Sequence, residues 1–172
     1  MDAKLAWLIP VLYPEARVIW VRRCPLDTAW SNFVQRFKNV KLQYSFSLDD
    51  ISRFYRSYET MTEHWRNTLT IPMMQIHYED LVLNPEAAIR DMIRFLGLSW
   101  EAPIMQFHAQ VNTKGVSTAS VYEVHEPIYS DAIGKWRPYA PYIEALVQAL
   151  GDWGSSSRHG SCALQGGGVM TS

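Results

Sequence analysis

Two adjacent arginines, Arg22 and Arg23, follow a short apolar run, and a serine hydroxyl comes eight residues after the second arginine, at Ser31. Guanidinium groups bind phosphate and sulfate in a bidentate manner, and the free N–H groups of a helix N-terminus also favour anions. This combination indicates an anion site. The alternative is that both arginines lie on the surface and pair with Glu15 and Asp27.

A second polar group, His77-Tyr78-Glu79-Asp80, follows another apolar run. The ring of Tyr78 can pack on a nucleobase, and its hydroxyl can accept from an exocyclic amine. We interpret Glu79 and Asp80 as carboxylates that fix the following loop, in preference to catalytic groups.

The long polar segment 116–136 is the third candidate, because loops of this length inside a compact domain are usually functional. It and the next residue supply groups that can donate to a phosphate or neutralise it: Ser117, Thr118, Ser120, Lys135 and Arg137. The alternative is a mobile surface loop. The five histidines form no HExxH motif and no pair on one helix face, so no metal site is expected.

The elements that position these residues follow from hydrophobic periodicity. The β-branched run 17–22 predicts a buried strand, and Pro25 then begins a helix over about 26–37 with Ala29 and Phe33 on its apolar face. Further patterns predict a helix capped by Asp49 or Asp50 that reaches Trp65, a strand 74–78, a loop 79–85, and helices over 85–96 and 141–150. This order predicts an α/β layer with parallel strands, in which ligands bind beyond the carboxyl ends of the strands.

Composition restricts the classes of function. The 172 residues suit one domain, and the net charge of -1 argues against nucleic acid as the main partner. No signal peptide and no run of about 18 apolar residues is present, so no transmembrane segment and a cytoplasmic location are expected. Six of the nine glycines follow Leu150, which predicts a disordered tail over 151–172. The body of the chain therefore lacks the GxxxxGK[ST] loop that a kinase would need.

Three segments together resemble the sulfotransferases that use 3′-phosphoadenosine 5′-phosphosulfate (PAPS). VIWVRRCPLDTAWSNF resembles the 3′-phosphate-binding segment of that family. IHYEDLVLNPEAAIRDMIRFLGL is similar to the segment that follows it, and STASVYEVHEPIYSDAIGKWRPY is similar to the C-terminal cofactor loop of bacterial-type and tyrosylprotein-type members. The resemblance runs from about Pro14 to Leu150.

The resemblance implies a P-loop-NTPase-like three-layer α/β fold with a parallel sheet, truncated at its N-terminus and largely helical in this chain. It implies that PAPS is the cofactor and that 3′,5′-adenosine bisphosphate is the product. Arg23 and Ser31 would hold the 3′-phosphate, and Tyr78 and Thr118 would lie on the adenine side. Ser120 and Lys135 would lie near the sulfate end, where Lys135 is a candidate catalytic group.

The segment 1–150 is thus expected to be a partial sulfotransferase domain without the first strand and the phosphate-gripping turn. The expected function is sulfuryl transfer from PAPS to a hydroxyl, with this chain keeping the 3′-phosphate and adenine half of the site. The alternative is a catalytically inactive nucleotide-binding or interaction remnant. The acceptor stays open among a peptide tyrosine, a carbohydrate hydroxyl and a small molecule. An exposed sheet edge predicts self-association.

Overall fold

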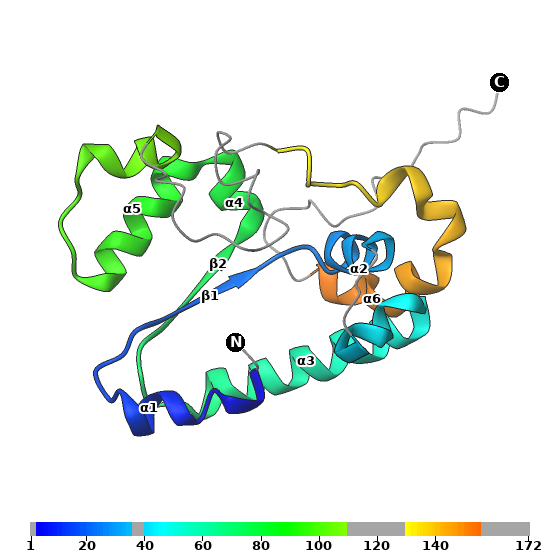
Figure 1. Ribbon diagram of the computed structural model, residues 1–172, viewed down its shortest axis with the longest axis horizontal. Coiled ribbons are helices and arrows are strands. Elements are labelled where there is room, and N and C mark those ends of the chain that lie inside the picture. The colour runs from blue at the N-terminus through cyan, green and yellow to red at the C-terminus, as the bar shows by residue number, and fades with distance from the viewer. Residues whose placement is uncertain (1–2, 36–39, 110–129, 156–172) are drawn as a thin grey trace. The chain divides into compact units, whose positions relative to one another are not determined.

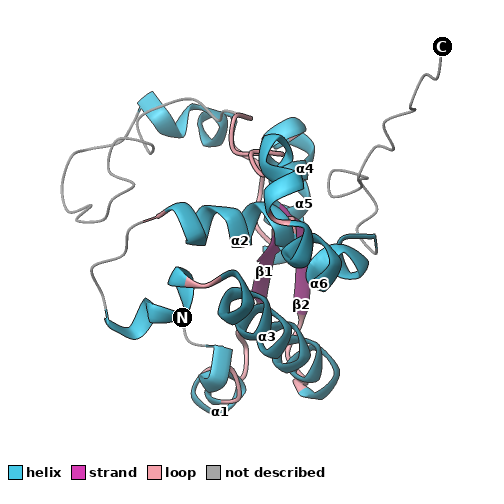
Figure 2. Cartoon of the chain, turned by 90° about the vertical axis from the view of Figure 1, so that its right-hand side faces the viewer, coloured by secondary structure: helices cyan, strands magenta, loops and turns pink. Residues whose placement is uncertain are grey.

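The computed structural model describes three stretches of the chain: 3–35, 40–109 and 130–155. The described part is mostly helical and contains one small parallel sheet, whose two strands lie side by side in Figure 2. The α/β class predicted from the alternation of strands and helices is thereby confirmed in its coarse form.

The described residues divide into two compact units. Unit 1 consists of the described parts of Met1–Trp7, Arg23–Leu69 and Ile133–Ser172. Unit 2 consists of the described parts of Leu8–Arg22 and Thr70–Ala132. The boundary at Arg22 falls where the first strand ends.

The sheet belongs to unit 2. Its strands, β1 (Val18–Arg22) and β2 (Met73–His77), are parallel and lie side by side in Figure 1. The register places Arg22 opposite His77, at the carboxyl ends of both strands. Both strands predicted from the sequence are confirmed to within one residue at each end, because the apolar runs that form them are short and sharply bounded.

Two helices of unit 2, α4 (Tyr78–Leu83) and α5 (Pro85–Leu96), pack against β2. The prediction of a loop after β2 is therefore wrong. Glu79 and Asp80 lie in the first turn of α4, where carboxylates interact favourably with the helix dipole, and the six-residue helix is too short to show a periodic pattern. The predicted end of α5 is confirmed, since Gly97 adopts φ 75° there.

Arg17, the residue before β1, interacts with the C-terminal end of α5. The Arg17 guanidinium donates a hydrogen bond to the carbonyl of Phe95 and lies 6.0 Å from the centroid of the Phe95 ring. Cations near a helix C-terminus are stabilising because they offset the negative end of the dipole. Unit 2 also contains the short helices α1 (Leu8–Leu12), which has no buried residue, and η3 (Ala102–Ala109).

Unit 1 is built from six helices in its described part: η1 (Ala3–Leu5), α2 (Pro25–Val34), η2 (Val40–Phe46), α3 (Leu48–Thr68), η5 (Arg137–Tyr142) and α6 (Glu144–Ser155). The predicted start of α2 at Pro25 is confirmed. The predicted cap of α3 is wrong, because the Ser47 hydroxyl accepts from the Asp50 N–H at 3.4 Å. A serine cap leaves Asp49 and Asp50 in the first turn, where their charges favour the helix.

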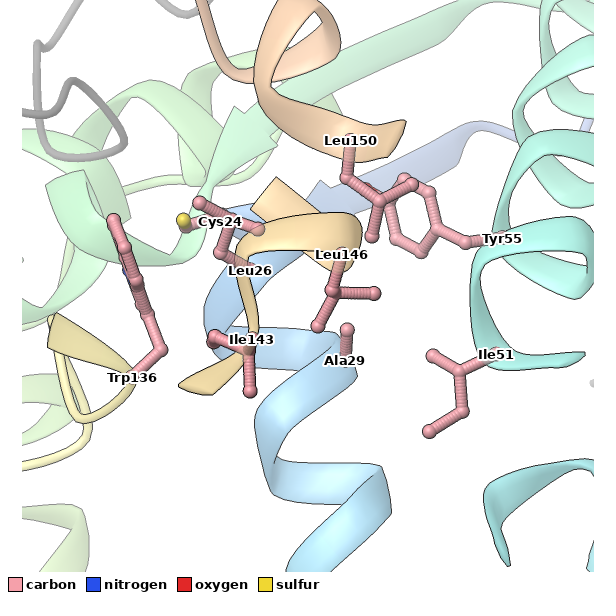
Figure 3. Close-up of a cluster of buried hydrophobic side chains, with 9 residues drawn as sticks. All are labelled: Cys24, Leu26, Ala29, Ile51, Tyr55, Trp136, Ile143, Leu146 and Leu150. Carbon is pink, nitrogen blue, oxygen red and sulfur yellow. The ribbon is translucent and has the colours of Figure 1, made fainter. Parts of the chain in front are cut away.

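The core of unit 1 combines side chains of α2, α3 and α6 with a tryptophan from the segment before η5. Figure 3 shows its members: Cys24, Leu26, Ala29, Ile51, Tyr55, Trp136, Ile143, Leu146 and Leu150. The Arg56 Nη2 atom adds a hydrogen bond to the carbonyl of Ala149, at 2.9 Å, which joins α3 to α6. Phe33, predicted on the same apolar face as Ala29, is instead 38% exposed, because it lies one turn beyond the part of α2 that the other helices cover.

The last helix reaches Ser155, five residues beyond its predicted end. Residues 156–172 lie outside the described part of the chain, so the predicted tail over 151–172 and the partial domain over 1–150 stay predictions. Among the described residues, no helix is both long and apolar enough to cross a bilayer. The same residues contain no cluster of three side chains suited to hold a metal ion.

Candidate functional site

The carboxyl ends of the two strands carry polar side chains in unit 2, as the sequence predicted. Arg22 is opposite His77 in the register of the sheet. Each makes a contact two residues back along its own strand: the Arg22 guanidinium carbon lies 5.2 Å from the Trp20 ring centroid, and His77 Nε2 lies 3.1 Å from Gln75 Nε2. Arg22 therefore packs on an indole of its own strand.

The next arginine, Arg23, connects the strand to α2. It precedes the N-cap residue Cys24 and is half-buried. The first turn of α2 is buried through Pro25, Leu26 and Asp27. The expectation that the free N–H groups of this helix N-terminus favour an anion stays a prediction. The guanidinium of Arg23 remains the cationic group of the candidate site.

Ser31 lies further along α2 and is exposed. Its backbone carbonyl accepts from the Gln35 N–H at 3.1 Å, so the hydrogen bonding of the helix is completed by the backbone. The hydroxyl is therefore accessible to a ligand. Arg23 and Ser31, which are eight residues apart, belong to the same unit. A site shared by the two side chains requires this.

Lys135 belongs to unit 1 as well and lies in a tight turn. The Arg137 N–H donates to the Gly134 carbonyl at 3.0 Å, which places Lys135 and Trp136 in the middle of the turn. Lys135 is exposed, whereas Trp136 is completely buried in the core. The turn thus exposes the side chains of Lys135 and Arg137 and fixes Trp136 inside the protein.

Sequence reasoning missed the group that holds this turn. The Asp27 carboxylate accepts a hydrogen bond from the Gly134 N–H at 2.7 Å, although the two residues are 107 positions apart. In the sequence, Asp27 was considered as a surface partner for the arginines. The burial of Asp27 in the structure shows the need for such a contact, because carboxylates are rarely buried without a specific partner.

Tyr78, the remaining described candidate, belongs to unit 2. It is the first residue of α4 and is half-buried. Glu79 is buried in the same turn, which agrees with its interpretation as a structural carboxylate. Thr118 and Ser120, predicted on the adenine side and near the sulfate end, lie outside the described residues.

A hollow of about 330 Å³ in unit 2 lies between β2, α4 and α5 and differs from the candidate anion site. Its polar lining consists of Gln75, His77, Asp80, Asn84 and Asp91. Two carboxylates with no lysine or arginine among the lining residues would repel a phosphate group. The hollow is therefore unsuited to an anionic nucleotide.

Comparison with known proteins identifies relatives of this chain. A family model described as the sulfotransferase family matches residues 4–102, which contain the first two of the three segments discussed above. An uncharacterized protein of Aquifex aeolicus is 30% identical over 145 residues, covering 83% of this chain and 19% of that protein. Protein-tyrosine sulfotransferase 1 of Danio rerio is 25% identical, covering 73% and 36%, and the protein-tyrosine sulfotransferase of Drosophila melanogaster is 24% identical, covering 79% and 28%. The chain thus spans about a fifth to a third of the length of these relatives.

Proposed function

The chain belongs to the sulfotransferase family, and from this membership we propose that it binds PAPS for transfer of the sulfuryl group to a hydroxyl acceptor. The observation that supports this proposal most is where three candidate residues stand relative to the two strands. A half-buried arginine directly follows one of two paired parallel strands, an exposed serine follows it on the next helix, and a tyrosine directly follows the other strand. Each residue matches a segment that resembles the family's cofactor site.

We propose the following roles for this chain's residues. Arg23 and Ser31 hold the 3′-phosphate, since a guanidinium and a hydroxyl are suitable donors to its oxygens. Tyr78 and Thr118 contact the adenine, and Ser120 and Lys135 lie toward the 5′ end. The proposed fold of the complete domain is the three-layer P-loop-like arrangement, of which the two described strands would form a part.

The chemistry requires positioning and charge stabilisation more than covalent participation by the protein, as in phosphoryl transfer. PAPS, when bound, supplies the sulfuryl group. Arg23 and Ser31 fix the nucleotide through its 3′-phosphate, and the Lys135 ammonium offsets negative charge at the other end of the nucleotide. These residues bind and orient, so the chain contributes the adenosine and 3′-phosphate half of the site.

The described side chains fit this assignment. Ser31 and Lys135 are exposed, and no described residue forms an ion pair with Lys135. An ammonium that is not paired with a carboxylate can bind an anionic ligand without first breaking an ion pair.

As acceptor we propose a protein tyrosine, because two of the relatives carry protein-tyrosine sulfotransferase in their names. A radiolabelled sulfate-transfer assay with tyrosine peptides tests this statement.

Calorimetry with 3′,5′-adenosine bisphosphate tests the binding function directly. Arg23→Ala is expected to weaken binding by about 10–150-fold, because hydrogen bonds to charged groups contribute about 1.5–3 kcal/mol. Arg53→Ala is the matched control, since that arginine is exposed and pairs with Asp50 at 3.8 Å on its own helix. Absence of binding by the wild type, or equal weakening by both variants, would refute the proposed site.

A further inference from the structure

The segment that carries Lys135 is attached to α2 at the residue before the lysine. The Gly134 N–H donates to Asp27 Oδ2 at 2.7 Å, and Asp27 is only 1% exposed. A buried carboxylate is costly unless its charge is compensated by hydrogen bonds. Asp27 lies in the first turn of α2, where a neutral apolar residue could not accept the Gly134 N–H. The carboxylate therefore indicates that this hydrogen bond is required.

The geometry of Gly134 shows how closely this contact defines the turn. Gly134 adopts φ 74°, a left-handed conformation that disfavours a side chain. A Cβ atom at this position would also lie 3.3 Å from Cδ and Nε of Arg137. The N–H of Gly134 is thus directed at Asp27 by a backbone conformation that glycine adopts without strain.

The residue after the lysine is attached to the same core. Trp136 is completely buried and shares its cluster with Leu26 and Ala29, which flank Asp27 and its neighbour on α2 (Figure 3). The backbone of Lys135 is therefore held on both sides, by a polar contact at Gly134 and by an apolar contact at Trp136. Its own side chain is exposed.

We propose that Asp27 is a positioning residue for Lys135, fixing the lysine relative to α2 and hence to Ser31, which lies one turn after Asp27. This inference rests on the proposed nucleotide site, in which Ser31 and Lys135 act on one ligand. Asp27 does not touch that ligand. It sets where the ammonium stands, because the backbone of the lysine cannot move without breaking the bond to the carboxylate.

A purely structural role for Asp27 makes a different prediction. Asp27→Ala would then lower the stability of the protein, but Lys135→Ala would weaken binding by the same factor with and without the carboxylate. A positioning role requires coupling, so that removal of the lysine costs little once Asp27 is gone. The two roles are therefore separated by a double-mutant cycle, Asp27→Ala against Lys135→Ala, with 3′,5′-adenosine bisphosphate as the probe.

The cycle is measured by calorimetry on the full chain. Lys135→Ala is expected to weaken binding about tenfold in the wild type, as for one charge-assisted contact, and less than about twofold in the Asp27→Ala background. Asp27→Asn, whose side-chain oxygen can still accept from Gly134, is expected to restore most of the coupling. Asp49→Asn is the matched control, since Asp49 is an exposed aspartate in the first turn of α3.

Hydrogen exchange at the Gly134 amide, followed by NMR, reports on the contact without any nucleotide. We expect slow exchange in the wild type, Asp27→Asn and Asp49→Asn, and faster exchange by at least about tenfold in Asp27→Ala. If Asp27→Ala does not fold, Gly134→Ala replaces it in the cycle, because a side chain at this position strains the left-handed backbone that directs the N–H at Asp27.

Equal losses from Lys135→Ala in both backgrounds, or unchanged Gly134 exchange in Asp27→Ala, would overturn the positioning role. If the wild type does not bind the bisphosphate, the proposed function fails and the positioning role fails with it. In that case the exchange measurement still shows whether Asp27 holds the turn, so the two failures are distinguishable.

Discussion

Arg22 and His77 are direct partners in the parallel sheet, at the carboxyl ends of β1 and β2. Each is engaged within its own strand, Arg22 on the Trp20 ring and His77 with Gln75. The residues that follow them, Arg23 and Tyr78, lie just beyond the strands. Strand pairing thus places the residue before each of these two candidates at the same edge of the sheet in unit 2.

A first prediction separates the base contact from the phosphate contact. Tyr78→Ala is expected to weaken binding of 3′,5′-adenosine bisphosphate and of 5′-AMP by the same factor, about 5–150-fold, because base stacking on an aromatic ring contributes about 1–3 kcal/mol. Tyr78→Phe keeps the ring and should weaken both nucleotides less. A loss confined to the bisphosphate would contradict the assignment of this tyrosine to the adenine.

The strands and the helices α2, α3 and α5 were predictable from the sequence, because each combines a clear period with a proline, serine, aspartate or glycine at its ends. Helix α4 was not, since six residues after a strand are too few for a pattern. Asp49 and Asp50 correctly indicated where α3 begins, since both lie in its first turn. The predicted N-cap was wrong, because Ser47 precedes both and caps the helix.

The candidate site was likewise only partly predictable from the sequence. Motif spacing singled out Arg23 and Ser31, and the polar segment 116–136 singled out Lys135; all three belong to one unit. The contact between Asp27 and Gly134 was not predictable, since it joins positions 107 residues apart through one backbone N–H. No periodicity or motif records such a pair, and only the folded chain brings the two together.

A second prediction concerns the stability of unit 2. Arg17→Ala removes the hydrogen bond to the Phe95 carbonyl and a cation near the C-terminus of α5. The free energy of unfolding is expected to fall by about 1 kcal/mol in urea titrations. Arg66→Ala, which removes an exposed pair with Glu63 at 3.5 Å, should change it by less than about 0.5 kcal/mol. Equal effects of the two variants would show that Arg17 does not stabilise α5.

A third prediction concerns alkaline pH. Burial raises the pKa of the Tyr44 phenol above its ordinary value, and the ring stacks on Phe54 with the centroids 4.0 Å apart. Above pH 10 this phenol ionises in the unfolded chain before it ionises in the folded protein. The free energy of unfolding therefore falls as the pH rises from there. Tyr44→Phe should therefore lose less stability than the wild type between pH 9 and 11, as measured by urea unfolding. Parallel curves for the two proteins would contradict this.

The ratio of affinities for 3′,5′-adenosine bisphosphate and 5′-AMP tests the central claim, that Arg23 and Ser31 hold a 3′-phosphate. The wild type is expected to prefer the bisphosphate by at least about tenfold, because the 3′-phosphate gains hydrogen bonds to a charged donor. Calorimetry of Ser31→Ala should show a smaller ratio, and the double variant Arg23→Ala with Ser31→Ala should bind both nucleotides within about twofold of each other, since the remaining contacts are shared. An unchanged preference in the double variant would contradict the account.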